Sequence, residues 1–88
     1  YFSDSKIESR VVIYGAGSAG VQLASALKVS EEMHPIAFLD KDKSLQNSFV
    51  GGLKVLAPQA LEKLIKKNKV DEVLIAIPSA SKSIPQTV

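Results

Sequence analysis

The sequence predicts an α/β fold in three layers, with a mostly parallel β-sheet between helices, and three observations support this. Short apolar runs rich in β-branched residues alternate with segments in which apolar residues recur at helical spacing. A glycine-rich turn joins the first of these runs to the first helical segment. The length of 88 residues suffices for one domain that is smaller than most.

The first half of the chain predicts a strand–helix–strand unit. Residues 1–9 are mostly polar and indicate a linker or disordered terminus, so that the domain covers residues 10–88. Residues 10–14 predict a strand buried on both faces, and residues 18–29 predict a helix. Residues 30–35 end this helix, because the residue before Pro35 disfavours helical geometry. Residues 36–39 form a second predicted strand.

The second half predicts a loop, a strand, a helix and a further strand. Residues 41–48 show no helical periodicity, and residues 49–52 predict a turn into a strand over residues 53–56. A helix follows from Pro58 to about Asn68, and residues 72–77 predict the fourth strand. Right-handed crossovers give the strand order 3-2-1-4.

This order leaves the fourth strand as an apolar edge. Such an edge favours pairing with another strand. We therefore expect a fifth strand beyond the C-terminus, or a partner subunit of a homo-oligomer, to cover it. The chain begins with Tyr1 rather than Met and ends at the start of another helical pattern. Both features indicate a piece of a longer protein, truncated at its C-terminus.

The turn after the first strand matches the pattern G-x-G-x-x-G. It covers six positions, Gly15, Ala16, Gly17, Ser18, Ala19 and Gly20. In this pattern the first glycine permits a tight turn, the second lets a pyrophosphate approach the backbone, and the third lets helix and strand pack closely. The helix N-terminus then directs unpaired N–H groups toward the phosphate. Because the motif follows a strand and opens a helix, we expect phosphate binding rather than a turn alone.

Asp40 ends the second predicted strand, about 20 residues beyond Gly20. A carboxylate at this place accepts hydrogen bonds from an adenosine ribose, which favours NAD over NADP. Lys41 and Lys43 follow and soften the repulsion of a ribose phosphate, so NADP stays a second candidate. Coenzyme A and a nucleotide-sugar are further alternatives.

Pro78, Ser79 and Ser81 follow the fourth predicted strand, where strand order reverses and ligands bind in open α/β sheets. We expect the hydroxyl groups of Ser79 and Ser81 to reach a phosphate or ribose in this topology. Either serine is also an ordinary helix cap, and the sequence leaves both interpretations open. Pro78 shapes the loop in either case.

The composition excludes several classes of function. The formal charge is +2, but the lysines of residues 63–69 follow one helix without interleaved aromatic residues, which indicates a solvated helix face rather than a nucleic-acid interface. The absence of cysteine excludes disulfides and thiolate metal sites. No apolar run approaches the ~18–20 residues of a membrane span.

No catalytic set is recognisable in the sequence. The Tyr-x-x-x-Lys pair is absent, and no carboxylate pair or metal-binding cluster has useful spacing. The only histidine, His34, is expected in a surface loop. The chain by itself therefore predicts ligand binding without a complete enzyme.

Four segments together carry a family resemblance: VVIYGAGSAG at 11–20, FLD at 38–40, GLKVL at 52–56 and DEVLIAIPSAS at 71–81. This set resembles the amino-terminal Rossmann domain, also described as CoA-binding-like, of membrane-bound nucleoside-diphosphate-sugar epimerases and dehydratases of bacterial polysaccharide biosynthesis. The resemblance covers nearly all of residues 10–81. A loop in place of the second crossover helix is typical of the family.

The resemblance implies an NAD-binding module within a larger NAD(P)-dependent enzyme that oxidises, dehydrates or epimerises a UDP-linked sugar. Membrane-spanning helices would precede it and a catalytic short-chain-dehydrogenase-like domain would follow, which places the module on the cytoplasmic face of the inner membrane. Two alternatives remain open. One is a non-catalytic regulatory or assembly module, and the other is the related domain of lipid-linked sugar-phosphate transferases.

Overall fold

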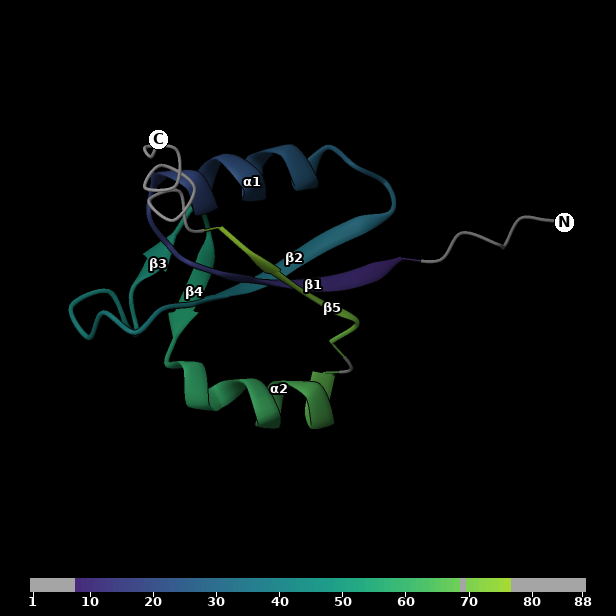
Figure 1. The fold of residues 1–88 in the computed structure, drawn as a ribbon. Helices are drawn as coiled ribbons and strands as arrows, with labels where there is room; N and C mark the ends of the chain where they lie inside the picture. The colour runs from purple at the N-terminus through teal and green to yellow at the C-terminus, as the bar shows by residue number, and fades with distance from the viewer. Residues whose placement is uncertain (1–7, 69, 77–88) are drawn as a thin grey trace, which may run out of the picture.

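The computed structural model describes residues 8–68 and 70–76, and it forms one sheet with a helix on either side (Figure 1). The central strands are β1 (Ser9–Tyr14) and β2 (Met33–Leu39), joined by helix α1 (Ser18–Lys28). A hairpin of β3 (Phe49–Val50) and β4 (Leu53–Leu56) follows. A 3-10 turn η2 (Pro58–Ala60) then leads into α2 (Leu61–Asn68) and β5 (Glu72–Ile75).

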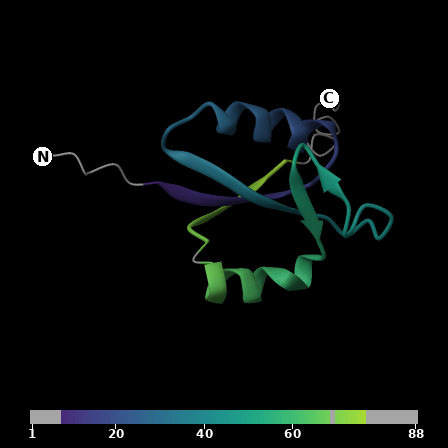
Figure 2. The same ribbon diagram turned by 180° about the vertical axis from the view of Figure 1, so that it is seen from behind.

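The sheet has five strands in the order β3-β4-β2-β1-β5. β1, β2, β4 and β5 are parallel, whereas β3 pairs with β4 in the antiparallel sense. The predicted order 3-2-1-4 corresponds to β4-β2-β1-β5 and is confirmed for these four strands, but it omitted β3. Figures 1 and 2 show α1 on one face of the sheet and α2 on the other, so the fold is α/β and Rossmann-like with a mixed sheet.

The β3–β4 hairpin corrects the interpretation of residues 49–52 as only a turn. Gly51 and Gly52 form the turn itself, with φ angles of 58° and 85° that L side chains rarely adopt. Phe49 then pairs with Lys54 and Val50 with Leu53. Residues 49–50 are therefore a strand, and the hairpin stands where a crossover helix would otherwise lie.

β2 begins earlier than predicted, since the structure extends it back to Met33 and through Pro35. Pro35 has no N–H to donate, but β4 pairs with β2 only at Phe38 and Leu39. On its β1 side the ladder shifts register between Val11 and Val12. The proline is thus tolerated in a stretch where β2 has one paired neighbour and an irregular ladder. His34, predicted in a surface loop, lies in this strand as a half-buried residue.

The main core lies between α1 and the sheet. Val11, Ile13, Phe38 and Val55 are fully buried there, and Ala24 and Leu27 of α1 pack on them. Burial of a side chain such as Phe38 contributes about 1.5–3 kcal/mol of hydrophobic stabilisation. Leu45, Val50 and Leu53 pack at the margin of the same core, so the loop and hairpin are attached to it.

Several sequence-based expectations fall outside the described residues. Pro78, Ser79 and Ser81 lie there, as do Ile77 and most of the proposed terminal linker. The domain limits and the roles of these residues stay predictions.

Candidate nucleotide-binding site

The glycine loop turns sharply out of β1 at Gly15. This residue has φ of +116°, and a Cβ on it would lie only 2.5 Å from the carbonyl oxygen of Ala76 in the segment after β5. The Gly15 N–H donates to the Leu39 carbonyl at 2.8 Å, and the Ala76 N–H donates to the Tyr14 carbonyl at 2.9 Å. The loop therefore begins in a narrow space between the ends of β2 and β5, where only glycine fits.

Gly20 lets α1 return close to the loop. A Cβ on Gly20 would lie 1.9 Å from the Gly15 carbonyl oxygen and 3.3 Å from the Phe38 ring. No real Cβ atom approaches a backbone oxygen so closely, so any larger residue requires the helix to move. The close packing predicted for the third glycine is present.

Gly17 is in a different environment, because nothing lies within 4 Å of the position that its Cβ would take. It is the N-cap residue of α1, without a side-chain capping hydrogen bond and without an acidic residue in the first helical turn. The first N–H groups of a helix have no partner within the helix, so they are free to bind an anion. Open space for a ligand and the free N–H donors of the helix therefore lie together at Gly17.

A pocket of about 250 Å³ opens at this loop. It is lined by Tyr14, Gly15, Gly17, Ser18, Asp40, Lys41 and Ala76. The structure thus brings five predicted site residues together at the carboxyl ends of β1, β2 and β5. Ala16 and Gly20 are buried, and together with Ala19 they are not part of the pocket lining.

Asp40 connects the glycine loop with the loop that follows β2. Its Oδ2 accepts a hydrogen bond from the Ala16 N–H at 2.8 Å, and its Oδ1 accepts one from the Asp42 N–H at 2.9 Å. The sequence predicted Asp40 beside the glycine loop but not its bonds to the backbone. Since each carboxylate oxygen has two lone pairs, one acceptor position per oxygen stays free for a ligand hydroxyl.

The loop over residues 41–48 is held by its own short polar side chains. Asp42 accepts hydrogen bonds from the Ser44 N–H at 2.9 Å and the Ser44 hydroxyl at 2.7 Å, and these bonds lower the pKa of Asp42 below its ordinary value of 3.8. The Gln46 side-chain amide donates to the Asp40 carbonyl at 2.8 Å. The loop then joins the sheet where the Asn47 N–H donates to the Val55 carbonyl at 2.7 Å. The loop that these hydrogen bonds hold carries Lys41, which lines the glycine pocket, and Lys43.

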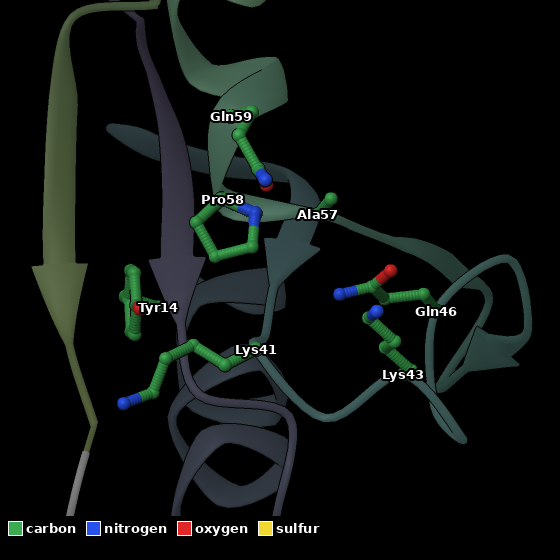
Figure 3. Close-up of a pocket in the computed structure, with 7 residues that line it drawn as sticks. All are labelled: Tyr14, Lys41, Lys43, Gln46, Ala57, Pro58 and Gln59. Carbon is green, nitrogen blue, oxygen red and sulfur yellow. The ribbon is translucent and has the colours of Figure 1, made fainter.

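A second recess of about 300 Å³ adjoins the glycine pocket (Figure 3). It is lined by Tyr14, Lys41, Lys43, Gln46, Ala57, Pro58 and Gln59. Tyr14 and Lys41 line both spaces. The sequence patterns did not indicate Tyr14, Gln46 and residues 57–59 as site residues. Of these, only Tyr14 could have been predicted, because it directly precedes Gly15.

The described residues contain no cluster of three or more His, Asp or Glu side chains that would hold a metal ion. The Nε2 atom of His34 lies 3.5 Å from the Glu8 carboxylate, at the amino ends of β1 and β2. The two pockets lie at the carboxyl ends, so His34 is not part of the site. None of the helices in residues 8–68 and 70–76 is long and apolar enough to span a membrane.

Comparisons with solved structures agree with this geometry. UDP-D-quinovosamine 4-dehydrogenase from Vibrio fischeri superimposes with a TM-score of 0.79 and is 48% identical in sequence, over 85% of this chain. RSP, a Rex-family repressor, superimposes with a TM-score of 0.74 at 22% identity over 82% of this chain. RSP in complex with β-NADH gives a TM-score of 0.72 at 21% identity.

The chain is a Rossmann-fold domain. The predicted resemblance to a nucleotide-sugar enzyme is confirmed by the 48% identity to the dehydrogenase, whereas the RSP structures support the fold alone. This chain spans 62% of the dehydrogenase chain and 35% of the RSP chain. No protein-family model and no curated protein sequence matches the chain.

Proposed function

We propose that this chain is the nucleotide-binding domain of a dehydrogenase that acts on a nucleotide-linked sugar. NAD is the first candidate for its ligand. The observation that carries the proposal is the open pocket at Gly17, at the uncapped N-terminus of α1. The identity of 48% to UDP-D-quinovosamine 4-dehydrogenase supports the sugar class of the substrate. The same identity favours a dehydrogenase over a sugar-phosphate transferase.

The residues of the pocket fit a dinucleotide diphosphate. The missing Cβ of Gly17 leaves room for the phosphates beside the first N–H groups of α1. The Ser18 hydroxyl adds a donor at the pocket wall. The helix dipole contributes about 0.3–1 kcal/mol to the binding of an anion at such a terminus.

Asp40 would orient the adenosine ribose. Its carboxylate is fixed by the Ala16 and Asp42 N–H groups and presents its remaining lone pairs to the pocket. The proposal also includes Ser79 and Ser81, as hydroxyl partners of a phosphate or ribose or as helix caps, and Pro78, as the residue that shapes their loop. NAD, when bound, supplies an acceptor for the hydride that leaves a sugar carbon during oxidation.

In the described residues His34 lies at the opposite end of the sheet from the pocket, and residues 8–68 and 70–76 contain no metal-binding cluster. The proposal therefore assigns sugar oxidation to residues elsewhere in the protein. The location on the cytoplasmic face of a membrane remains part of the same proposal.

Titration calorimetry of the full chain with NAD, NADP, coenzyme A and UDP-sugars tests the assignment. We expect NAD to bind, and a Gly17→Val variant to lose binding while keeping its fold, because its side chain enters open space. Ser25→Val is the matched control, at an exposed position of α1 outside both pockets. Absence of binding by every nucleotide at millimolar concentration would contradict the proposal.

A role in assembly is the second candidate, and the outer edge of β5 favours it. Val73 and Ile75 are 37% and 71% exposed on β5, which is an edge strand among the described residues, and exposed apolar side chains on an edge strand favour pairing with another chain. Light scattering with and without NAD separates the two roles. A dimer that ignores the nucleotide and persists in Gly17→Val supports assembly, and a monomer in every condition argues against it.

A further inference from the structure

The recess in Figure 3 is a cationic extension of the glycine pocket. Lys41 and Lys43 line it together with the Gln46 amide and the β4–α2 junction at Ala57–Gln59, and no acidic residue of the described chain is part of its lining. Tyr14 and Lys41 also line the glycine pocket. The two spaces therefore adjoin each other and share part of their walls.

Among the described residues, neither lysine forms an ion pair with a carboxylate. In Figure 3 the Lys41 side chain extends toward Tyr14, and Lys43 and Gln46 come from the loop that forms another part of the lining. The backbone positions of both lysines are fixed by the Asp40 and Asp42 turns and by the Gln46 bond to Asp40. Two cations are thus held on one ordered loop at the wall of one recess.

Among the described residues, Asp40 is the only carboxylate in the lining of the adjoining glycine pocket. Both of its oxygens already accept backbone N–H hydrogen bonds, at 2.8 and 2.9 Å. Hydrogen bonds from fixed N–H dipoles compensate part of a carboxylate charge. Its repulsion of a phosphate in the lysine recess is correspondingly reduced. The sequence-based prediction of an unphosphorylated ribose rested on the charge of Asp40 and did not include these two hydrogen bonds.

We propose that the lysine recess is a subsite for a phosphoryl group on the adenosine ribose of the ligand. This inference rests on the proposed nucleotide-binding function and extends it to phosphorylated adenosine nucleotides, of which NADP carries a 2′-phosphate and coenzyme A a 3′-phosphate. The diphosphate occupies the N-terminus of α1, the ribose lies at Asp40, and the additional phosphate accepts hydrogen bonds from Lys41 and Lys43.

Calorimetry with small probes tests the subsite in the full chain. The probes are AMP, adenosine 2′,5′-diphosphate and adenosine 3′,5′-diphosphate, which differ only in the ribose phosphate. At least one diphosphate should bind about tenfold more tightly than AMP, as expected for one or two charge-assisted hydrogen bonds. Tighter binding of the 2′ isomer indicates an NADP-type ligand, and tighter binding of the 3′ isomer a coenzyme A-type ligand.

Lys43→Ala is the decisive variant, because Lys43 lines the recess but not the glycine pocket. It should reduce the preference for the phosphorylated probe to within about twofold while AMP binding stays unchanged. Lys66→Ala is the matched control, since Lys66 is exposed on α2 and lines neither pocket. The control should retain the full preference.

The outcomes separate the two proposals. If AMP and NAD bind but neither ribose phosphate increases affinity, the subsite is wrong and the nucleotide-binding function stands. If Lys43→Ala and Lys66→Ala weaken all probes equally, the effect is general electrostatic attraction and the subsite is again wrong. If no adenine nucleotide binds at millimolar concentration, both proposals fail.

Discussion

A Cβ atom on Gly20 would lie 1.9 Å from the carbonyl oxygen of Gly15. Both partners are backbone, so no flexible side chain is available to move aside. The first turn of α1 therefore lies directly against the glycine loop at Gly20, whereas Gly17 faces open space, so the two glycines have different roles.

Gly20→Ala should therefore destabilise the fold by about 3 kcal/mol, the upper range for overpacking. For a domain of this size, each kcal/mol corresponds to about 4–8 °C in the melting temperature. Thermal unfolding followed by circular dichroism measures the effect. Gly17→Ala is the matched control and should unfold within a few degrees of the original chain. Equal melting temperatures for Gly20→Ala and the original chain would refute the close packing.

Asp40→Asn should loosen the glycine loop even without ligand. The asparagine side chain has one acceptor oxygen, so it replaces only one of the two backbone hydrogen bonds to Ala16 and Asp42. Loss of one such bond costs about 1 kcal/mol, which corresponds to roughly fivefold faster exchange of the amide that loses it, at Ala16 or at Asp42. Hydrogen exchange followed by NMR measures this rate.

Asp71→Asn is the control for that experiment. Asp71 also accepts a backbone hydrogen bond, from the Arg10 N–H at 2.8 Å, but at the opposite end of β1. It should leave the exchange of Ala16 unchanged. If the amides of Ala16 and Asp42 are both as protected in Asp40→Asn as in the original chain, the carboxylate does not hold the loop.

Lys28→Met should weaken the attachment of the β3–β4 hairpin to α1. The Lys28 Nζ atom donates to the Gly51 carbonyl at 2.6 Å, whereas methionine keeps much of the aliphatic stem without the donor. Because both residues are exposed, we expect a loss of no more than about 1 kcal/mol in urea denaturation. Lys63→Met on α2 serves as the comparison. If the Lys28–Gly51 hydrogen bond does not stabilise the fold, Lys28→Met and Lys63→Met will have the same stability.

The 41–48 loop should respond to acid through Asp42. The two hydrogen bonds from Ser44 hold the pKa of Asp42 below 3.8 in the folded chain. A carboxyl whose pKa is lowered by folding contributes stability above its unfolded pKa, and that contribution is lost as the pH falls through the folded pKa. The loop should therefore keep the Asp42–Ser44 bonds at neutral pH and lose them only as the pH falls through the lowered pKa of Asp42, which lies below 3.8.

NMR titration of the Asp42 carboxyl carbon measures this pKa directly. Ser44→Ala removes the hydroxyl donor, which is the larger cause of the shift, and should raise the pKa of Asp42 toward 3.8. Ser25→Ala, on the exposed surface of α1, should leave it unchanged. An Asp42 that titrates identically in the original chain and in Ser44→Ala would disprove the assigned cause.

Local patterns predicted the parts of the fold that local interactions determine. The β-branched run before Gly15 and the helical spacing after it are enough to define β1 and α1, and right-handed crossovers then order the parallel strands. The β3 strand was missed because its two residues are too few for a periodic signal. Its existence depends on the pairing of Val50 with Leu53 and on the core beneath them.

In the site, too, some features follow from local sequence and others depend on the tertiary structure. The glycine loop and Asp40 follow a sequence pattern, because their spacing reflects one strand–helix–strand unit. Tyr14, Gln46 and Pro58 reach the lysine recess from three separate segments, and only the completed sheet brings them together. The bonds of Asp40 to Ala16 and Asp42 likewise depend on loop conformation, which no residue spacing encodes.

The position of Tyr14 between the two pockets gives the protein an intrinsic optical probe. The sequence contains no tryptophan and only two tyrosines, Tyr1 and Tyr14, so ultraviolet emission from a Tyr1→Phe chain would come from the binding site alone. An adenine ring entering beside the phenol should quench that emission. Occupancy of the site would then be followed in real time on the unlabelled protein, without any enzymatic turnover.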